Sequence, residues 1–437
     1  MTDKLDKYYE SNDFYSKKPV YIDVEELTET QLHRLVKSDT FCMLPWIHMH
    51  AFPDGRAYPC CLSLMNHPVG TLKERTMAEI WNDAPLRQMR SNMLAEKPCK
   101  ECTKCYEQEA NGFFSMRNSQ NKNMGHHIDV VDETQPDGTL ERFELKYYDI
   151  RFSNLCNLSC RTCGDIFSSN WVKESKKMGW LPKDAPNVNY AGRYEMDMWE
   201  QMEPHLDTVE NIYFAGGEPL MMKEHWNILE ELLSRGRTDV RLNYNTNFTE
   251  TVFKQRDVLE MWNKFDRVSV GASLDANWQR GEVMRRGTDW NKIVSNRKRM
   301  LEICPNVDFF ISATLSIMNV FNVVDFHREW VEQGLIEPQD FHINILQDPK
   351  RYRIDVLPEE MKKRIEELYN SHIEWLSPQD NLARAVNGFR SAITFMNANN
   401  NTELLQEFVY RTDQLDQFRN ENFFAVFPEL EELRKYA

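Results

Sequence analysis

From about residue 143 onward, short apolar runs alternate with longer segments that are apolar on one side only. The short runs predict strands at 146–152, 211–214, 240–244, 267–274, 309–315 and 341–346. The longer segments predict helices at 166–178, 225–236, 251–264, 289–304 and 322–332. Strands separated by helices indicate βαβ units and a parallel sheet, whose active site is expected beyond the carboxyl ends of the strands.

The two ends of the chain have different patterns. Residues 1–40 are polar and mixed, with a helix expected at 24–36, and residues 76–94 predict a helix that kinks or splits at Pro85. Residues 118–142 are polar and read as a linker. Beyond residue 355 the pattern is helical only, at 358–376, 381–396 and 402–420. We therefore expect five parts, which are an N-terminal extension 1–40, a cysteine-rich domain 41–117, a linker 118–142, an α/β core domain 143–350 and a C-terminal helical region 351–437.

Composition narrows the class of protein. With 41% hydrophobic and 28% charged residues, the 437-residue chain predicts a soluble globular protein with a sizeable core. No run of 18 apolar residues and no secretory signal is visible, so we expect a cytoplasmic protein that does not enter a membrane. The net charge of −15 makes nucleic acid an unlikely partner.

Cysteine is distributed very unevenly. The chain has ten cysteines, nine of them between Cys42 and Cys163, and only Cys304 lies beyond. Disulfide frameworks belong to small secreted domains, whereas clustered cysteines in a large chain without an export signal indicate metal binding. Cys304 closes a predicted helix and is expected in the core.

One set of cysteines directly follows the first predicted core strand. Cys156, Cys160 and Cys163 have the spacing Cys-x3-Cys-x2-Cys. Three thiolates on a short loop can hold three corners of an iron–sulfur cube and leave one iron open to a small molecule. A zinc ion would need a fourth ligand nearby. The alternative is that the three thiols are incidental.

This loop resembles that of the radical S-adenosylmethionine (SAM) superfamily, which implies a partial (β/α)6 barrel. A second matching motif, Tyr213–Leu220, ends the second strand. In isolation it could be a simple strand-to-helix turn. The resemblance implies that Gly216, Gly217, Glu218 and Pro219 contact the amino group of SAM. Weaker matches imply further SAM contacts at Asn247, Ser273, Asp275 and Asn344. The family usually has an aromatic residue where this chain has Thr162, which leaves adenine stacking at that position in doubt.

The resemblance also implies a mechanism. A [4Fe–4S] cluster chelates SAM through its open iron, and an electron from an outside reductant such as flavodoxin or ferredoxin splits SAM into methionine and a 5′-deoxyadenosyl radical. That radical then abstracts a hydrogen atom from the substrate, while the protein supplies orientation and a dry cavity.

The remaining cysteines form a second set. Residues 51–59 read as a hairpin that turns at Asp54-Gly55, which brings Cys42 and Cys60 near each other. The helical stretch 76–94 then returns the chain to the Cys-x2-Cys-x2-Cys run of residues 99–105. Two pairs of thiolates could hold either a zinc ion or a fully ligated [4Fe–4S] cluster.

This set resembles the twitch domain, a shortened SPASM domain, here placed before the barrel rather than after it. The resemblance implies an auxiliary cluster on Cys42, Cys60, Cys102 and Cys105. Cys61 and Cys99 remain as alternates.

These motifs predict the class of reaction but not the substrate. The expected protein is a radical SAM enzyme that acts either on a peptide or on a small-molecule substrate. The alternative is a non-catalytic iron–sulfur or zinc scaffold. Arg285 and Arg286 could hold a substrate carboxylate or could lie in a solvated turn. His126 and His127 fit packing or solvation better than a site. The C-terminal helices are hypothesised to cap the mouth of the barrel.

Overall fold

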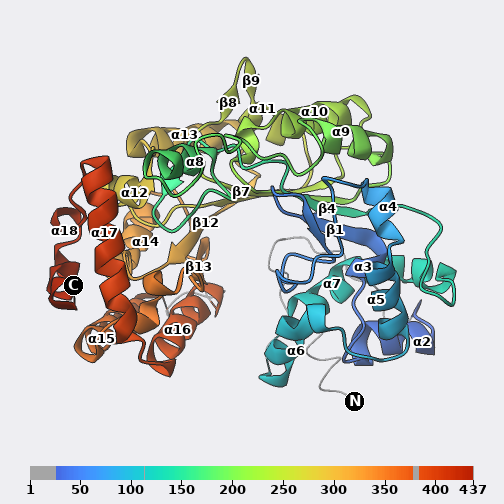
Figure 1. Ribbon diagram of the computed structural model, residues 1–437, viewed down its shortest axis with the longest axis horizontal. Coiled ribbons are helices and arrows are strands. Elements are labelled where there is room, and N and C mark those ends of the chain that lie inside the picture. Colours follow the sequence, from blue (N-terminus) through green and yellow to red (C-terminus); the bar gives the residue numbers. More distant parts are fainter. Residues whose placement is uncertain (1–25, 113, 377–382, 437) are drawn as a thin grey trace. The chain divides into compact units, whose positions relative to one another are not determined.

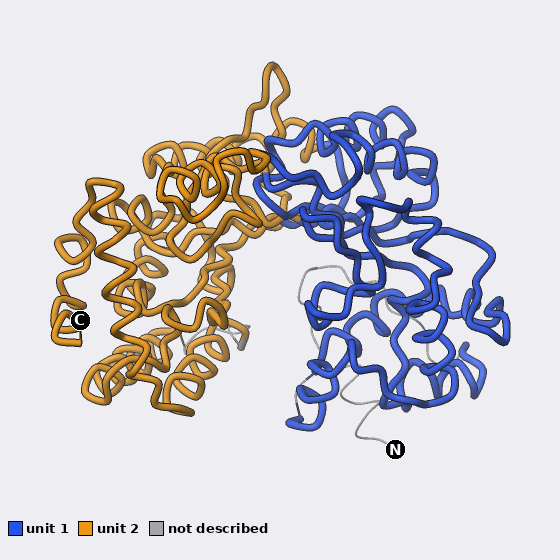
Figure 2. The backbone as a smooth tube through the Cα atoms, in the orientation of Figure 1, with its two compact units in different colours: residues 1–154, 188–243, 264–269 blue, residues 155–187, 244–263, 270–437 orange. Residues whose placement is uncertain are grey.

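The computed structural model describes residues 26–112, 114–376 and 383–436 (Figure 1). The chain forms two compact units (Figure 2), and each is described by itself. Unit 1 comprises residues 1–154, 188–243 and 264–269, and unit 2 comprises residues 155–187, 244–263 and 270–437. Within the described residues, no helix has both the length and the apolar character needed to cross a bilayer.

Unit 1 contains a mostly parallel set of strands. In spatial order these are β6 (Asn211–Phe214), β4 (Tyr147–Ile150), β1 (His48–Ala51), β2 (Arg56–Tyr58) and β3 (Gly70–Thr71). β1 pairs parallel to β4 and β4 pairs parallel to β6, whereas β2 is antiparallel to both of its neighbours. The predicted hairpin is therefore present, and it also extends the parallel strands of the core, which the sequence pattern did not reveal.

The helices of unit 1 follow from local signals. The expected helix 76–94 is split into α4 (Met77–Trp81) and α5 (Ala84–Leu94), with Pro85 in the first turn of α5, where a missing N–H costs nothing. α4 begins at a capping box formed by Thr76 and Glu79. The other helices are α2 (Glu29–Leu32), α3 (Leu44–Ile47), α6 (Thr103–Ala110), α7 (Met116–Met124), α9 (Asp197–Met202) and α10 (Lys223–Ser234). Of the helix expected at 24–36, residues 24–25 lie outside the described residues, and the rest forms α2 and a π-helical turn over His33–Lys37.

The segment 118–142, interpreted as a linker, is largely helical. It contains most of α7 and the 3-10 helix η4 (Gly125–Glu133). Asn121 is fully buried and hydrogen-bonds backbone groups of residues 35–43. The polar character of residues 118–142 therefore reflects a buried hydrogen-bond network rather than exposure to solvent.

Unit 2 holds the rest of the α/β pattern. β7 (Arg241–Thr246) and β10 (Val268–Ala272) have residues in both units, and β12 (Asp308–Leu315) pairs parallel to β13 (Phe341–Ile345). The helices between strands are α8 (Ser169–Lys177), α11 (Val258–Trp262), α12 (Trp278–Met284), α13 (Trp290–Ile303) and α14 (Val323–Glu332). The C-terminal helices are α15 (Glu359–Leu376), α16 (Ala383–Ala398), α17 (Leu405–Arg419) and α18 (Phe423–Val426), with α16 packed against both α15 and β13 (Figure 1).

The predicted α/β class with a parallel sheet is confirmed, and the six predicted core strands are found within a few residues of their expected bounds. One predicted helix is much shorter than expected. Residues 252–257 form a hairpin, β8 (Val252–Phe253) with β9 (Arg256–Asp257), and only α11 remains of the helix at 251–264. Lys254 at the turn has φ = +48°, a conformation that does not continue a helix.

Candidate iron–sulfur sites

Four cysteines of unit 1 line one small cavity. Cys42 lies just before α3, Cys60 follows β2, and Cys102 and Cys105 lie at the start of α6. The cavity has a volume of about 20 Å³. The other residues that line it are Leu44, Leu62, Glu101, Lys104, Met116 and Arg117.

The hairpin brings the first two of these cysteines together. β1 and β2 pair antiparallel with His50 opposite Tyr58, so the strand that leads to Cys60 runs back along the strand that follows Cys42. The turn between them places Gly55 at φ = +88°, which side chains rarely tolerate. The cysteine spacing therefore depends on a turn that only glycine makes without strain.

Helix α7 fixes the backbone around Cys42. The Asn121 amide oxygen accepts the N–H of Met43 at 2.9 Å, and its amide nitrogen donates to the carbonyl of Phe41 at 3.0 Å. Arg117 donates to the same carbonyl at 2.7 Å. The residues on both sides of Cys42 are thus held by buried side chains.

The chemistry of this cavity suits a metal centre held by thiolates. Burial raises the pKa of the thiols of Cys42, Cys60, Cys102 and Cys105. Thiols of raised pKa are neutral at pH 7, and they ionise when a metal replaces their protons. Four thiols that line one cavity are the donor set of either a zinc ion or a fully ligated [4Fe–4S] cluster.

The other two cysteines of unit 1 face elsewhere. The Cys99 sulfur lies 3.8 Å from the carbonyl of Met89, to which it donates, and burial raises the pKa of this thiol to about 11. Cys61 lines a different cavity. The four cysteines expected from the resemblance are thus the four that share a cavity, and their role as ligands stays a prediction.

That second cavity, which the sequence did not reveal, has a volume of about 70 Å³ and a polar lining. Asp149 is buried beside it, where it accepts a hydrogen bond from His50 Nδ1 at 2.9 Å and pairs with Arg151 Nε at 3.0 Å. The lining residues are Cys61, Met116, Gln120, Asn123, Tyr147, Asp149, Arg151, Asn211, Tyr213, Arg241 and Asn243. A sequence signal for this cavity does exist, because polar side chains occur at every second position at Tyr147, Asp149 and Arg151. This spacing is typical of one polar face of a strand.

In unit 2, the cysteine loop lies between β4 and α8. Its short strand β5 (Ser159–Cys160) pairs antiparallel with β11 (Arg285–Arg286), which places Cys160 opposite Arg285. Inside the loop, the N–H of Cys163 donates to the carbonyl of Cys160 at 3.0 Å. The Cys156 N–H donates to Ser169 Oγ of α8 at 3.2 Å. All three cysteines thus belong to one hydrogen-bonded loop.

Two of these sulfurs face nitrogen donors. Asn247 Nδ2 lies 3.9 Å from Cys156 Sγ, and Arg285 Nη1 lies 3.8 Å from Cys160 Sγ. Burial raises the pKa of Cys160, and it raises the pKa of Cys163 to about 12. N–H groups near sulfur stabilise the negative charge that a thiolate ligand carries. Of the predicted SAM contacts, Asn247 is thereby brought to the cysteine loop.

Arg285 has a buried carboxylate partner from its own unit. Its Nε and Nη2 donate to the two oxygens of Asp275 at 2.8 and 3.0 Å, and the backbone N–H of Thr314 donates to the same carboxylate at 2.8 Å. Burial lowers the pKa of Arg285, but the Asp275 charge more than offsets this and keeps the guanidinium protonated. Arg285 therefore does not lie in a solvated turn.

Helix α17 holds the cysteine loop from the C-terminal region. The buried Arg161 pairs with Asp416, and it also pairs with Glu421 at 2.6 Å. Arg419 donates to the carbonyl of Ser159 at 2.8 Å and pairs with Glu174 of α8 at 2.7 Å. No local sequence signal points to these contacts, because 255 positions separate Arg161 and Asp416 in the chain.

Four predicted SAM contacts lie in unit 1, in the turn after β6. Gly216 has φ = +124°, and a Cβ there would lie 3.2 Å from the Cβ of Arg151. The Gly217 N–H donates to the carbonyl of Ser153 at 3.1 Å. Glu218 is buried and accepts the N–H of Leu220 at 3.1 Å, and Pro219 opens the 3-10 turn that follows. The turn thus requires glycine at Gly216 and is folded tightly against β4.

The last predicted contacts are in unit 2. The Ser273 N–H donates to the carbonyl of Thr246 at 2.7 Å. Asn344 on β13 donates to Ser312 Oγ on β12 at 2.9 Å. Both, like Asp275, lie at or near the carboxyl ends of their strands, and their contact with SAM stays a prediction.

Comparison with known proteins gives one family match. A family model described as SPASM, an iron–sulfur cluster-binding domain, matches residues 42–106. This segment contains all four cysteines that line the cavity, so an iron–sulfur domain is indicated in unit 1. No curated protein matches the chain.

Several solved structures are similar to the chain at low identity. Native anSMEcpe with bound AdoMet and the Cp18Cys peptide has 16% identity and a TM-score of 0.35, with 51% of this chain and 58% of that chain covered. Streptococcus suis SuiB bound to S-adenosylmethionine has 13% identity and a TM-score of 0.38, with 67% and 64% covered. The chain thus spans less than two thirds of the length of either.

Proposed function

We propose that this chain is a radical SAM enzyme with two iron–sulfur sites. The observation that carries the proposal is the Cys156–Cys163 loop, in which three cysteines follow the first core strand and two of the sulfurs face N–H donors. The SPASM match to residues 42–106 supports it, because that model describes an iron–sulfur cluster-binding domain.

The cysteine loop is proposed to hold a cluster with one open position. Cys156, Cys160 and Cys163 provide three thiolates, and no fourth cysteine lies in this loop. When bound, the cluster and SAM supply a reducing electron and the 5′-deoxyadenosyl radical that abstracts hydrogen from the substrate. Asn247 and Arg285 donate toward the sulfurs, and Arg161 anchors the loop to α17.

The cavity of unit 1 is proposed to hold the auxiliary [4Fe–4S] cluster. Cys42, Cys60, Cys102 and Cys105 provide four thiolates, which leaves no open position. A closed site of this kind is suited to electron transfer or to a structural role rather than to binding SAM.

The SAM contacts are proposed as the resemblance implies. In unit 1 they are Gly216, Gly217, Glu218 and Pro219, with backbone groups and a carboxylate to accept from an ammonium. In unit 2 they are Asn247, Ser273, Asp275 and Asn344. Asp275 acts at least in part as a positioning residue, since it fixes Arg285 beside Cys160.

The substrate and the electron donor complete the proposal. We expect a peptide substrate, because the twitch and SPASM proteins that the chain resembles commonly modify peptides. The outside reductant is proposed to be a flavodoxin or a ferredoxin. Residues 41–117 are proposed as the auxiliary-cluster domain and residues 143–350 as the radical SAM core.

The direct test is product analysis. Protein reconstituted with iron and sulfide, reduced under anaerobic conditions and given SAM should form 5′-deoxyadenosine and methionine, both measured by mass spectrometry. Replacing Cys156, Cys160 and Cys163 by Ala should abolish both products. Cys304→Ala is the matched control in the same unit, since Cys304 is buried at the end of α13 and lies outside the loop.

A fully loaded protein that forms no 5′-deoxyadenosine with reductant and candidate peptides would contradict the proposal. It would favour a scaffold that binds iron–sulfur clusters or zinc without cleaving SAM.

A further inference from the structure

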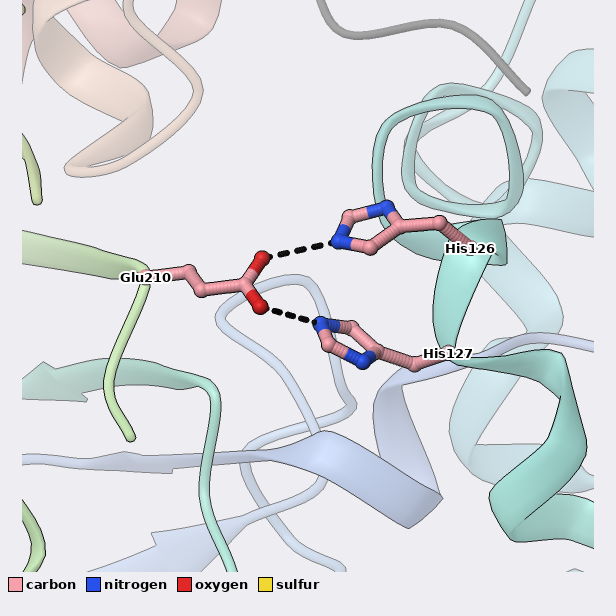
Figure 3. A group of neighbouring side chains, drawn as sticks. All are labelled: His126, His127 and Glu210. Atoms are coloured by element: carbon pink, nitrogen blue, oxygen red, sulfur yellow. Dashed lines mark hydrogen bonds and ion pairs between the residues drawn. The ribbon is translucent and has the colours of Figure 1, made fainter. Parts of the chain in front are cut away.

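A third group of metal-binding side chains lies in unit 1, apart from all the cysteines. His126 Nε2 lies 2.8 Å from one carboxylate oxygen of Glu210, and His127 Nε2 lies 2.9 Å from the other. The three side chains point toward one another (Figure 3), with a ligand atom of each within 4.8 Å of the others. Two imidazoles and a carboxylate thus converge on one point.

The backbone that carries these three side chains is held by hydrogen bonds and regular secondary structure. Glu210 directly precedes β6, where its N–H donates to the carbonyl of Lys146 and its own carbonyl accepts the N–H of Arg241, both at 2.9 Å. The two histidines open η4, which directly follows α7. Fixed backbones lower the ordering cost of bringing three ligands to one ion.

An ion-pair cluster alone accounts poorly for this arrangement. The two imidazole rings lie 4.1 Å apart between centroids, and one carboxylate can neutralise only one imidazolium. The Nε2 atom of His127 is buried, and despite its short distance to Glu210 it makes no hydrogen bond of acceptable geometry among the described residues. A buried nitrogen in that state is costly unless a cation accepts its lone pair.

From this geometry we propose that His126, His127 and Glu210 bind a divalent transition-metal ion of the zinc type. Imidazole nitrogens favour Zn²⁺, Co²⁺, Ni²⁺ and Fe²⁺, whereas Mg²⁺ and Ca²⁺ prefer oxygen ligands throughout. Three protein ligands leave at least one coordination position to water. The ion joins η4 to the strand end at Glu210, and it shares no ligand with the cysteine sites.

The site also has a structural consequence for its surroundings. Helix α7 leads directly into the two histidines, and it supplies Met116 and Arg117 to the four-cysteine cavity. It also supplies Gln120 and Asn123 to the polar cavity. A metal that ties η4 to β6 therefore stiffens the element that lines both cavities.

Cobalt(II) is a suitable probe, because its absorption reports its ligands. Cluster-loaded protein titrated anaerobically with Co²⁺ should bind one equivalent with the weak visible bands of nitrogen and oxygen ligation, without the intense charge-transfer absorption of thiolate ligation. The double variant His126→Ala/His127→Ala should lose this binding. Glu210→Gln should weaken it by at least about tenfold.

The matched control is His33→Ala. His33 faces a single carboxylate, that of Glu96 at 3.4 Å, with no second histidine beside it. This variant should bind Co²⁺ as the unaltered protein does. Iron content and circular dichroism of each variant show whether the fold and the clusters are retained.

Zinc provides a second readout. Added Zn²⁺ should displace Co²⁺ and raise the unfolding temperature of the unaltered protein but not that of the double variant. Absence of Co²⁺ binding at submillimolar concentration, or equal binding by the double variant, would overturn the proposal and leave an ion-pair cluster only.

Discussion

The two cysteine sites are built in opposite ways. The cavity of unit 1 gathers four thiols from segments that span residues 42 to 105, and it depends on a hairpin, two helix starts and the anchor that α7 provides. The loop of unit 2 takes its three thiols from eight consecutive residues. The first site has enough sulfur to close a cluster, whereas the second has one sulfur too few.

The surroundings of the two sites differ as well. The loop sulfurs face Asn247 and Arg285, and the loop itself is bound to α17 through buried ion pairs. In the unit 1 cavity, Arg117 lies beside the thiols but donates to backbone carbonyls and to Glu109. Both sites nevertheless depend on distant parts of the chain, since α7 holds the backbone around Cys42 and α17 holds the Cys156–Cys163 loop.

The largest expected effects are on iron content and SAM cleavage, and they distinguish the two sites completely. Replacing the three loop cysteines by Ala should remove about half of the iron, roughly four atoms per chain, and abolish SAM cleavage. Replacing Cys42, Cys60, Cys102 and Cys105 should remove the other half and leave some cleavage of SAM without substrate. Iron analysis and 5′-deoxyadenosine assays measure both.

Controls for this pair of variants are available in unit 1. Cys99→Ala and Cys61→Ala should keep all of the iron, because neither thiol lines the four-cysteine cavity. Loss of the second cluster in either variant would show that the ligand set has been assigned incorrectly.

The next effect tests the support of the loop by α17. Arg161→Met leaves the carboxylates of Asp416 and Glu421 without their buried partner and should lower the free energy of unfolding by about 3 kcal/mol. Urea denaturation measures this, and iron should be lost first from the loop. Lys363→Met, which breaks an exposed pair with Glu360, should cost well under about 1 kcal/mol.

A matching test in unit 1 is Asn121→Ala. It removes the hydrogen bonds to Met43 and Phe41 on either side of Cys42 and leaves the Met43 N–H unpaired, and a buried group left unpaired in this way costs about 1–3 kcal/mol. The auxiliary cluster should become more labile toward a chelator, while SAM cleavage at the loop changes little. A variant that instead loses the loop cluster first would contradict the separation of the two sites.

The smallest effect concerns the charge beside the loop sulfurs. Arg285→Met removes the donor 3.8 Å from Cys160 and should make the loop cluster harder to reduce, slowing SAM cleavage about tenfold. Arg285→Lys, which keeps the charge, should retain more of the rate. A redox titration that finds the same potential in all three proteins would show that Arg285 has only a structural role.

Much of this arrangement could be predicted from local sequence signals. Apolar runs located the core strands, Asp54-Gly55 located the hairpin, and Pro85 located the break between α4 and α5. The four cysteines that share a cavity are those chosen by spacing and resemblance.

The features that could not be predicted are determined by contacts between residues far apart in the sequence. Asn121 reads as solvent-exposed until its backbone partners are known, which is why residues 118–142 were interpreted as a linker. Arg285 reads as a turn residue until Asp275 is found beside it, and nothing near Arg161 in sequence points to α17. Polar side chains give no periodic signal when their partners are buried far along the chain.

The most direct test of the central claim, that only the loop cluster is open, is electron paramagnetic resonance of the two reduced cysteine variants with and without SAM. In the variant that lacks Cys42, Cys60, Cys102 and Cys105, SAM should change the spectrum of the remaining loop cluster. In the variant that lacks the loop cysteines, SAM should leave the remaining spectrum unchanged. A loop signal that SAM does not alter, or an auxiliary signal that it does, would contradict the account.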